Sequence, residues 1–369
     1  MSAEHDPKAR RVLITGLSTY WGGRLAQALE GFEQIEAIIG VDSRDPTLEL
    51  ERTEFVKVSN HHSLLQRIVR AAEIDTVIDA RMIVNSLGAP VRATHENNVI
   101  GTMNILAACS GPDSPVRKFV FKSSTHYYGS EQDDPAFFTE AMRRPHAPAT
   151  RIERDVIEAE QAVAEFAARR PEVTVTLLRC ANDLGPDVDT GFTRMLALPM
   201  VPVVLGFDPR LQFVHEDDVV HALEHAAINR VPGTYNVAAD GVLALSEAIS
   251  LVGRRPLPLL PPIGAGLLAA PLRRLGFRTP DEMANLLRFG RGVDNRLYKA
   301  TGFVYGFTSR EAVIRLGEHM RLEPILRGRA REEGYVYERE VEEFLRWSPH
   351  VRRERPSEGA GADREPLGI

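Results

Sequence analysis

The sequence predicts an α/β fold, with a Rossmann-type doubly wound parallel sheet and a smaller α/β C-terminal substrate lobe. Over residues 11–180, short apolar runs alternate with stretches whose apolar residues recur at helical spacing. This alternation is typical of a parallel sheet covered by helices on both faces, because each parallel connection needs a crossover. A length of 369 residues and a hydrophobic fraction of 43% are enough for two domains of ordinary size.

Each expected strand and helix of the sheet domain follows from the spacing of its apolar residues. The strands are short apolar runs, and the helices between them carry apolar residues three and four positions apart. Strands are expected at residues 11–16, 35–42, 55–58, 76–80, 118–121 and 173–178. Helices are expected at residues 22–29, 63–72, 97–109 and 152–168. Beyond residue 181 the pattern is less regular, with strands expected at 211–215 and 234–238.

The same patterns divide the chain into four parts. Residues 1–10 are polar and are predicted to be disordered, and residues 11–180 are predicted to form the Rossmann domain. Residues 181–322 are expected to form the substrate-binding lobe, which shares elements with the first domain. Residues 323–369 are dominated by Arg and Glu, which predicts a charged C-terminal helix and a disordered tail.

Composition excludes several classes of protein. A net charge of −6 and a pI near 6.0 argue against a dedicated nucleic-acid binder, whose binding surface would be basic. The two cysteines, Cys109 and Cys180, form no disulfide framework or zinc spacing, so a reducing cytoplasm is expected. The polar N-terminus lacks the apolar core of a signal peptide, and no apolar run is long enough to predict a transmembrane segment.

The strongest local signal is the glycine loop at residues 15–22, TGLSTYWG, between the first strand and the first helix. A dinucleotide pyrophosphate would rest there on free backbone N–H groups at the helix N-terminus. In a T-G-x-x-G-x-x-G loop, Gly16 makes the tight turn and Gly22 permits close packing of helix on strand. Thr19 replaces the middle glycine, which would let the backbone approach the phosphates.

Asp42 closes the second expected strand, where a carboxylate accepts the adenosine ribose hydroxyls of a dinucleotide. Its negative charge would repel a 2′-phosphate, so NAD is favoured over NADP. Arg44 lies two residues further on and moderates that preference. The alternative interpretation of both signals is a Rossmann-like scaffold whose groove is empty or degenerate.

Further motifs follow in a recognisable order. They are NNVIGT at 97–102, SSTHYYG at 123–129, LRCAN at 178–182, FVHEDD at 213–218 and GTYN at 233–236. With the loop and Asp42, they resemble an extended short-chain dehydrogenase/reductase of the NAD-dependent epimerase/dehydratase family. Within it, the chain is similar to a divergent actinobacterial group labelled UDP-glucose 4-epimerase-like. The resemblance covers residues 11–320, and it implies NAD as cofactor and a nucleotide sugar or similar small molecule as substrate.

The resemblance also assigns site residues. Ser124 matches the catalytic serine, and Asn182 and Arg210 are expected on the substrate side. Ser59 and Arg81 depart from the family pattern, which has an Asp contacting adenine and a small residue at these positions. The cofactor residues implied by the resemblance are Gly16, Ser18, Thr19, Tyr20, Trp21, Gly22, Asp42, Ser43, Arg44, Ser59, Ala80, Arg81, Asn98, Ser123 and Ala181.

The family's proton relay is absent from this sequence. A tyrosine normally exchanges a hydroxyl proton, and a lysine four residues later lowers its pKa, since a phenol with a pKa of about 10 is a poor base. The expected positions are occupied by Ile152 and Val156. No tyrosine or lysine occurs between Gly129 and Arg179, and none of the eight tyrosines has a lysine four residues later.

Other residues near the expected site are weaker candidates for replacing that relay. Tyr128 is more often structural, and His126 and His146 are expected to be hydrogen-bonded neighbours. Charged residues around the vacant positions are expected to be solvated on a helix surface, since arginine is no base at neutral pH. They are Arg151, Arg154 and Asp155.

Two further patterns resemble functional motifs but have simpler structural explanations. His221, Glu224 and His225 spell H-x-x-E-H, which could bind zinc, but no third ligand is evident and amphipathic packing explains the stretch. We therefore expect no metal. Residues 257–272 are apolar but contain four prolines, so a wall or lid of the substrate lobe is favoured over lipid contact.

Three functional hypotheses remain open. The chain is an NAD-binding epimerase-like enzyme with an unidentified base, a non-catalytic NAD(H) sensor or scaffold, or an oxidoreductase acting on a lipid or isoprenoid alcohol. An enzyme should have a cavity that joins Asp42, Ser124 and Asn182. A scaffold should have the nicotinamide end filled by Ile152 and Val156. The resemblance also implies a homodimer through the helices at 97–109 and 152–168.

Overall fold

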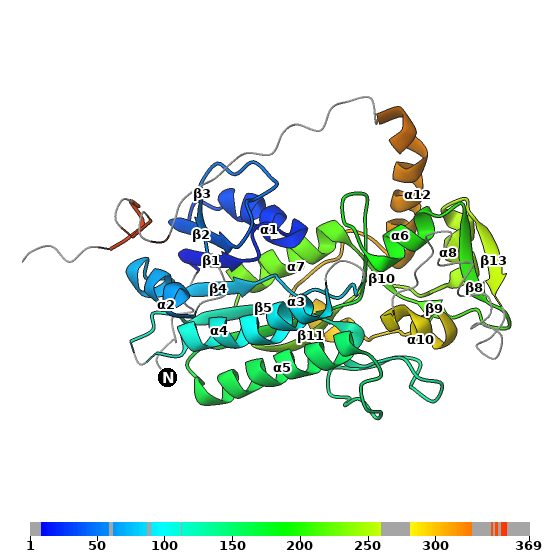
Figure 1. Cartoon of the computed structure of the whole chain (residues 1–369), viewed down its shortest axis with the longest axis horizontal. Coiled ribbons are helices and arrows are strands. Elements are labelled where there is room, and N and C mark those ends of the chain that lie inside the picture. The colour runs from blue at the N-terminus through cyan, green and yellow to red at the C-terminus, as the bar shows by residue number, and fades with distance from the viewer. Residues whose placement is uncertain are drawn as a thin grey trace, which may run out of the picture.

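The computed structural model describes residues 9–58, 62–86, 90–111, 113–259, 281–326, 341, 344–345 and 348–352. Seven strands form its main sheet, in the order β11–β6–β5–β4–β1–β2–β3, and all neighbours are parallel (Figure 1). This arrangement confirms the predicted doubly wound α/β fold. The strands are β1 (Arg11–Thr15), β2 (Ala37–Asp42), β3 (Thr53–Lys57), β4 (Thr76–Asp79), β5 (Lys118–Ser124), β6 (Thr174–Cys180) and β11 (Gly233–Val237).

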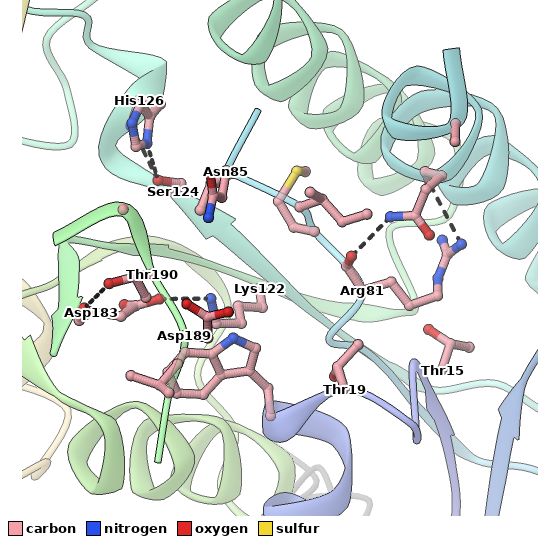
Figure 2. A pocket seen from close by; sticks show the side chains of 18 of the residues that line it. Thr15, Thr19, Arg81, Asn85, Lys122, Ser124, His126, Asp183, Asp189 and Thr190 are labelled. Carbon is pink, nitrogen blue, oxygen red and sulfur yellow. Dashed lines mark hydrogen bonds and ion pairs between the residues drawn. The ribbon is translucent and has the colours of Figure 1, made fainter. Parts of the chain in front are cut away.

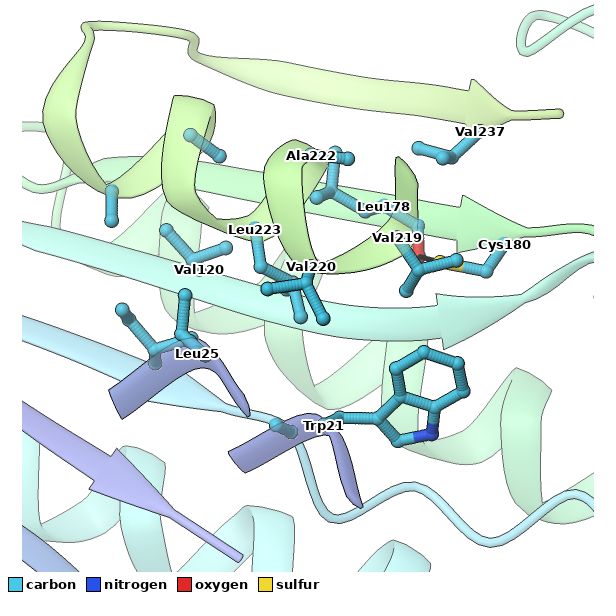
Figure 3. Close-up of a cluster of buried hydrophobic side chains, with 14 of the residues drawn as sticks. Trp21, Leu25, Val120, Leu178, Cys180, Val219, Val220, Ala222, Leu223 and Val237 are labelled. Carbon is cyan, nitrogen blue, oxygen red and sulfur yellow. Dashed lines mark hydrogen bonds between the residues drawn. The ribbon is translucent and has the colours of Figure 1, made fainter. Parts of the chain in front are cut away.

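Helices cover both faces of this sheet because its strands are apolar on both sides. In β1, Val12 and Ile14 belong to one buried cluster and Leu13 to another, since successive side chains point to opposite faces. Helices α1 (Tyr20–Glu30) and α7 (Glu216–Ile228) pack on the first face (Figure 3). Helices α2 (His62–Ala71), α4 (Gly101–Cys109) and α5 (Arg151–Arg169) pack on the second.

Figure 3 shows how α7 closes the first face. Its Leu223 lies over Val120 of β5, its Val219 lies by Cys180 of β6, and Leu25 of α1 lies near Val120. All five side chains are buried. Burying a side chain of this size contributes about 1.5–3 kcal/mol, so this packing holds α1 and the loop before it against the sheet.

The expected helix at 97–109 is longer and less regular than its sequence pattern. It begins as α3 (Val91–His95), continues through a π-helical segment (Glu96–Ile100) and ends as α4. In the π-helical segment the Asn98 amide bonds both backbone groups of Ile83, its Nδ2 donating at 2.7 Å and its Oδ1 accepting at 2.9 Å. These bonds hold the chain after β4 against the helix.

A second lobe is built from small sheets. The pairs are β10 (Phe213–His215) with β7 (Asn182–Leu184), β12 (Leu243–Ala244) with β9 (Arg210–Leu211), and β13 (Arg255–Leu259) with β8 (Met200–Val204). A third apolar cluster, including Leu211 and Phe213, forms its core. Its helices are α6 (Gly191–Ala197), α8 (Leu245–Leu251), α10 (Asp281–Phe289) and α12 (Ser309–Leu326), while α11 (Arg296–Lys299) adjoins β11.

Several sequence-based expectations fall outside the described residues. These are the disorder of residues 1–8, the apolar segment beyond Leu259, and the tail beyond Arg352. The disorder predicted for residues 9 and 10 is wrong, because Ala9 is buried and the Arg10 N–H donates to Asp75 at 3.1 Å. Residues 348–352 lie near α2, where the Arg352 N–H donates to the Ala71 carbonyl at 2.7 Å. Within the part of the chain that is described, no helix combines the length and apolar character that crossing a bilayer requires.

Candidate functional site

A cavity of about 660 Å³ runs along the carboxyl edge of the main sheet, between the sheet and the second lobe. Asp42 lies at one end of its lining, and Ser124 and Asn182 lie at the other. Open α/β sheets bind ligands at this edge, and ligand pockets are typically of this volume. The cavity therefore joins the three residues that the enzyme hypothesis requires to share one site.

The Asp42 end combines a carboxylate with an apolar slot. Asp42 Oδ2 accepts hydrogen bonds from the backbone N–H and the hydroxyl of Ser18, at 3.1 and 2.7 Å. Its Oδ1 accepts from the backbone N–H of Ser43 at 2.7 Å. Val58 and Leu65 line the cavity beside it. A carboxylate next to an apolar wall suits a ribose and its attached base.

The glycine loop turns tightly and packs closely. Gly16 has φ +84°, which favours glycine, and a Cβ on Gly22 would lie 2.1 Å from the Gly16 carbonyl oxygen. Thr19 is the N-cap of α1, and its hydroxyl accepts a hydrogen bond from the Gly22 N–H at 3.1 Å. The N–H groups of Tyr20 and Trp21 lie in the first turn, where the helix itself supplies no acceptor.

Arg81 lies against this loop. A Cβ on Gly16 would come within 2.5 Å of Arg81 Cγ. The guanidinium forms two 3.0 Å hydrogen bonds with the buried Asp79, which also accepts from the Thr15 hydroxyl at 2.8 Å. Asp79 therefore neutralises Arg81, and the arginine fills the space that a small residue would leave open.

At the opposite end, Ser124 and His126 form a pair (Figure 2). Ser124 Oγ lies 2.8 Å from His126 Nδ1, and both residues line the cavity. Burial, with the charges of Arg291 and Arg144, holds the pKa of His126 well below 6.5. The imidazole is therefore neutral at pH 7, and the pair can orient a hydroxyl or carbonyl group without carrying charge.

Lys122 and Asp183 were not predicted as site residues. Lys122 Nζ lies 3.3 Å from Asp183 Oδ2, both side chains are almost fully buried, and both residues line the cavity (Figure 2). The ammonium also lies 4.4 Å from the centre of the Trp21 ring. Lys122 is two residues before Ser124 on β5, so strand alternation places both on one face. That spacing is the sequence signal that could have found it.

The positions expected for tyrosine and lysine face away from the cavity. Ile152 and Val156 of α5 are 3% and 0% exposed and belong to the apolar cluster beneath the second sheet face. Neither lines the cavity. Asp155, on the same helix, is buried and not solvated as expected, and its carboxylate lies 2.8 Å from Nδ1 of His95. Among the described residues, positions 152 and 156 therefore bring no tyrosine or lysine to the cavity.

The predicted site residues divide into three groups. Ser59 lies outside the described residues. Those that line the cavity are Thr19, Trp21, Asp42, Ser43, Arg44, Arg81, Ser124, Ala181 and Asn182. Those that do not line it are Gly16, Ser18, Tyr20, Gly22, Ala80, Asn98, Ser123 and Arg210.

Two members of the last group hold lining residues in place. Asn98 holds Ile83, a lining residue, and Ser18 holds Asp42. Ser123 donates to the buried Glu160 at 2.5 Å. Arg210 is exposed on β9. The cofactor and substrate roles of all these residues remain predictions.

The histidines of the H-x-x-E-H pattern lie on α7, outside the cavity lining. His225 Nε2 lies 3.0 Å from the Thr301 hydroxyl, and its ring packs on Tyr298 and Phe303. Among the described residues, no group of three or more His, Cys, Asp or Glu side chains is placed to hold a metal ion.

The sequence model of the NAD dependent epimerase/dehydratase family matches residues 12–238. The chain belongs to this family. It is 37% identical over 320 residues to uncharacterized proteins of Mycobacterium tuberculosis and Mycobacterium bovis, with 84% of this chain and 84% of each relative covered. The match begins at the second residue of β1 and ends just after β11, so it covers the main sheet apart from Arg11.

Solved structures of nucleotide-sugar epimerases share the fold. UDP-glucose 4-epimerase from Thermotoga maritima, solved with UDP-glucose, aligns with a TM-score of 0.65 at 19% identity, covering 85% of this chain and 99% of that one. UDP-glucuronic acid 4-epimerase from Bacillus cereus, solved with NAD, aligns with a TM-score of 0.65 at 15% identity, covering 87% and 98%.

Proposed function

We propose that this family member binds NAD or NADH together with a nucleotide sugar or similar small molecule in the cavity between sheet and lobe. The observation that carries the proposal is the continuity of the cavity from Asp42 to Ser124 and Asn182. Members of the fold solved with NAD or with UDP-glucose support both ligand classes.

The residues at the Asp42 end fit a dinucleotide. Asp42 would hold the adenosine ribose, Val58 and Leu65 would flank the base, and the first-turn N–H groups of α1 would face the pyrophosphate. The fit is incomplete at Thr19, whose hydroxyl occupies the Gly22 N–H. When bound, NAD supplies a hydride acceptor, and NADH a donor.

The chain's own residues at the far end can bind and orient a sugar hydroxyl. Ser124 and His126 both line the cavity and contact each other, and the Asn182 amide is fixed by donating to the Gln212 carbonyl at 2.8 Å. Turnover would have to proceed without the tyrosine–lysine relay. Epimerase-like catalysis in this protein is therefore non-standard or lost.

The second candidate function is a non-catalytic NAD(H) sensor or scaffold. Ile152 and Val156 favour it because neither side chain can transfer a proton. Both side chains lie in the apolar cluster, however, and do not fill the nicotinamide end of the cavity as this hypothesis expected. The predicted homodimer is proposed for either function, and the exposed Ile100 and Met103, 45% and 46% exposed beside and on α4, support it. A cytoplasmic location is likewise proposed for either function, supported by the free thiols of Cys109 and Cys180.

Calorimetric titration of the purified chain with NADH and UDP-glucose tests the proposal, followed by assay for conversion of UDP-glucose to UDP-galactose. Binding of both ligands with turnover that falls in Ser124→Ala supports an enzyme. Binding of NADH without turnover supports the sensor. Failure of the protein to bind any dinucleotide overturns both versions.

A further inference from the structure

The buried Lys122–Asp183 ion pair carries a desolvation cost, and the stability of the fold does not require such a pair. Its side chains are 2% and 5% exposed, and replacing a buried ion pair by apolar groups is often neutral or stabilising. The neighbouring strands β5 and β6 are otherwise apolar or hydrogen-bonded on this face, with Val120 and Leu178 fully buried. A role in binding explains the pair better than a role in stability.

One atom of the pair is left unsatisfied. Asp183 Oδ1 is buried and has no hydrogen-bond partner, whereas Oδ2 faces Lys122. An unpaired buried carboxylate oxygen carries a large desolvation penalty. Because Asp183 lines the cavity, a donor group on a bound ligand can supply the missing bond.

The pair has the chemistry of a hydroxyl site. Asp183 Oδ1 can only accept a hydrogen bond while the carboxylate is ionised, and the Lys122 ammonium can only donate. A hydroxyl group does both, whereas a phosphate would be repelled by the carboxylate. Trp21, whose ring lies 4.4 Å from Nζ, limits where the ammonium can move.

We propose that Lys122 and Asp183 form a subsite for a sugar hydroxyl. Asp183 Oδ1 accepts a hydrogen bond from the hydroxyl, and Lys122 is the residue that positions the carboxylate. The subsite lies on the same face of β5 as Ser124, so it extends the far end of the cavity. The hydroxyl belongs either to the ribose of a dinucleotide or to the hexose of a nucleotide sugar. This inference rests on the proposed function, which supplies both ligand classes.

Calorimetry of the full chain with four probes distinguishes these sources. NADH is compared with ADP, and UDP-glucose with UDP, so that each pair differs in the sugar that would reach the subsite. In Asp183→Asn, we expect affinity for NADH or for UDP-glucose to fall about ten- to hundredfold, the effect of losing a hydrogen bond to a charged group. Affinity for ADP and UDP stays at the wild-type value, and the probe that weakens identifies the source.

Two further variants test whether the loss of affinity is specific to this subsite. Lys122→Met/Asp183→Asn removes both charges, so it shows the same selective loss even where the single variant folds poorly. Asp240→Asn breaks a Lys–Asp pair outside the cavity, where Lys299 Nζ lies 2.9 Å from Asp240 Oδ2, and leaves all four affinities unchanged.

Unchanged affinity of Asp183→Asn for each sugar-bearing probe that the wild type binds would overturn the inference while leaving the proposed function intact. Equal weakening of all four probes would also overturn it, because it would show a structural role alone. A wild-type chain that binds none of the probes overturns the proposed function, and this inference with it.

Discussion

The hydroxyl of Thr19 and the backbone N–H of Gly22 are joined by a 3.1 Å hydrogen bond in the first turn of α1. The same hydroxyl donates to the Gly16 carbonyl at 2.7 Å, so one side chain ties both ends of the glycine loop together. A glycine at this position would leave that N–H available to an anion. In this chain the Thr19 hydroxyl caps the loop, whereas the family pattern has a glycine there that leaves the N–H group open to a phosphate.

Replacing Thr19 by glycine should therefore strengthen dinucleotide binding. We expect Thr19→Gly to bind NADH several-fold more tightly in calorimetry, and to lose only a few tenths of a kcal/mol in stability, as N-cap replacements by glycine do. Thr150→Gly is the matched control, because Thr150 caps α5 by accepting from the Glu153 N–H at 3.3 Å. Weaker NADH binding in Thr19→Gly would mean that the threonine hydroxyl itself contacts the ligand.

Asp42 should set both affinity and cofactor choice. Asp42→Asn removes the charged acceptor and its repulsion of a 2′-phosphate, so we expect affinity for NAD to fall about tenfold or more and the preference over NADP to narrow. Asp45→Asn serves as control, since Asp45 pairs with Lys57 at 3.2 Å outside the cavity lining. Equal NAD affinity in wild type and Asp42→Asn would remove Asp42 from the site.

Restoring a lysine on α5 should destabilise the protein and leave activity unchanged. Val156 is fully buried among apolar side chains, so Val156→Lys places an ammonium there whose pKa is lowered by burial. Shifts of three units or more correspond to about 4 kcal/mol at pH 7, and this loss shrinks as pH rises towards the ordinary lysine pKa of about 10.4. Urea unfolding at pH 7 and pH 9.5, with Val156→Met as control, measures it. A neutral effect would place position 156 at the cavity.

The pH dependence of stability should carry a contribution from Glu216. Burial raises its pKa to about 7, against the hydrogen bonds that its carboxylate accepts from the Asp187 and Val188 N–H groups. The folded state then binds more protons than the unfolded one between about pH 4.3 and 7, so this contribution to stability is full below that window and is lost as pH rises through it.

Glu216→Gln should remove this slope. The unfolding free energy of the variant, relative to wild type, rises from pH 5 to 7 and is constant above. A flat difference for Glu216→Gln would show that Glu216 is ionised throughout.

The sequence predicts this fold well because its signals are local. The apolar runs at 11–16 and 118–121 and the helical period at 152–168 correspond to β1, β5 and α5 within a few residues. The site is less predictable, since Lys122 and Asp183 are 61 residues apart and meet only when β5 and β7 come together. Likewise, the low pKa of His126 depends on its burial and on the charges of Arg291 and Arg144, all of which arise only once the chain has folded.

The central claim is that the Asp42 end of the cavity binds a nicotinamide dinucleotide that lacks a 2′-phosphate. Thermal unfolding with NAD, NADH and NADP tests this claim. A ligand at 100 times its dissociation constant stabilises the folded state by about 2.7 kcal/mol, which shifts the midpoint by several degrees. We predict that NAD or NADH raises the midpoint and that NADP does not. A midpoint that no dinucleotide moves would contradict the account and show that the groove no longer binds a cofactor.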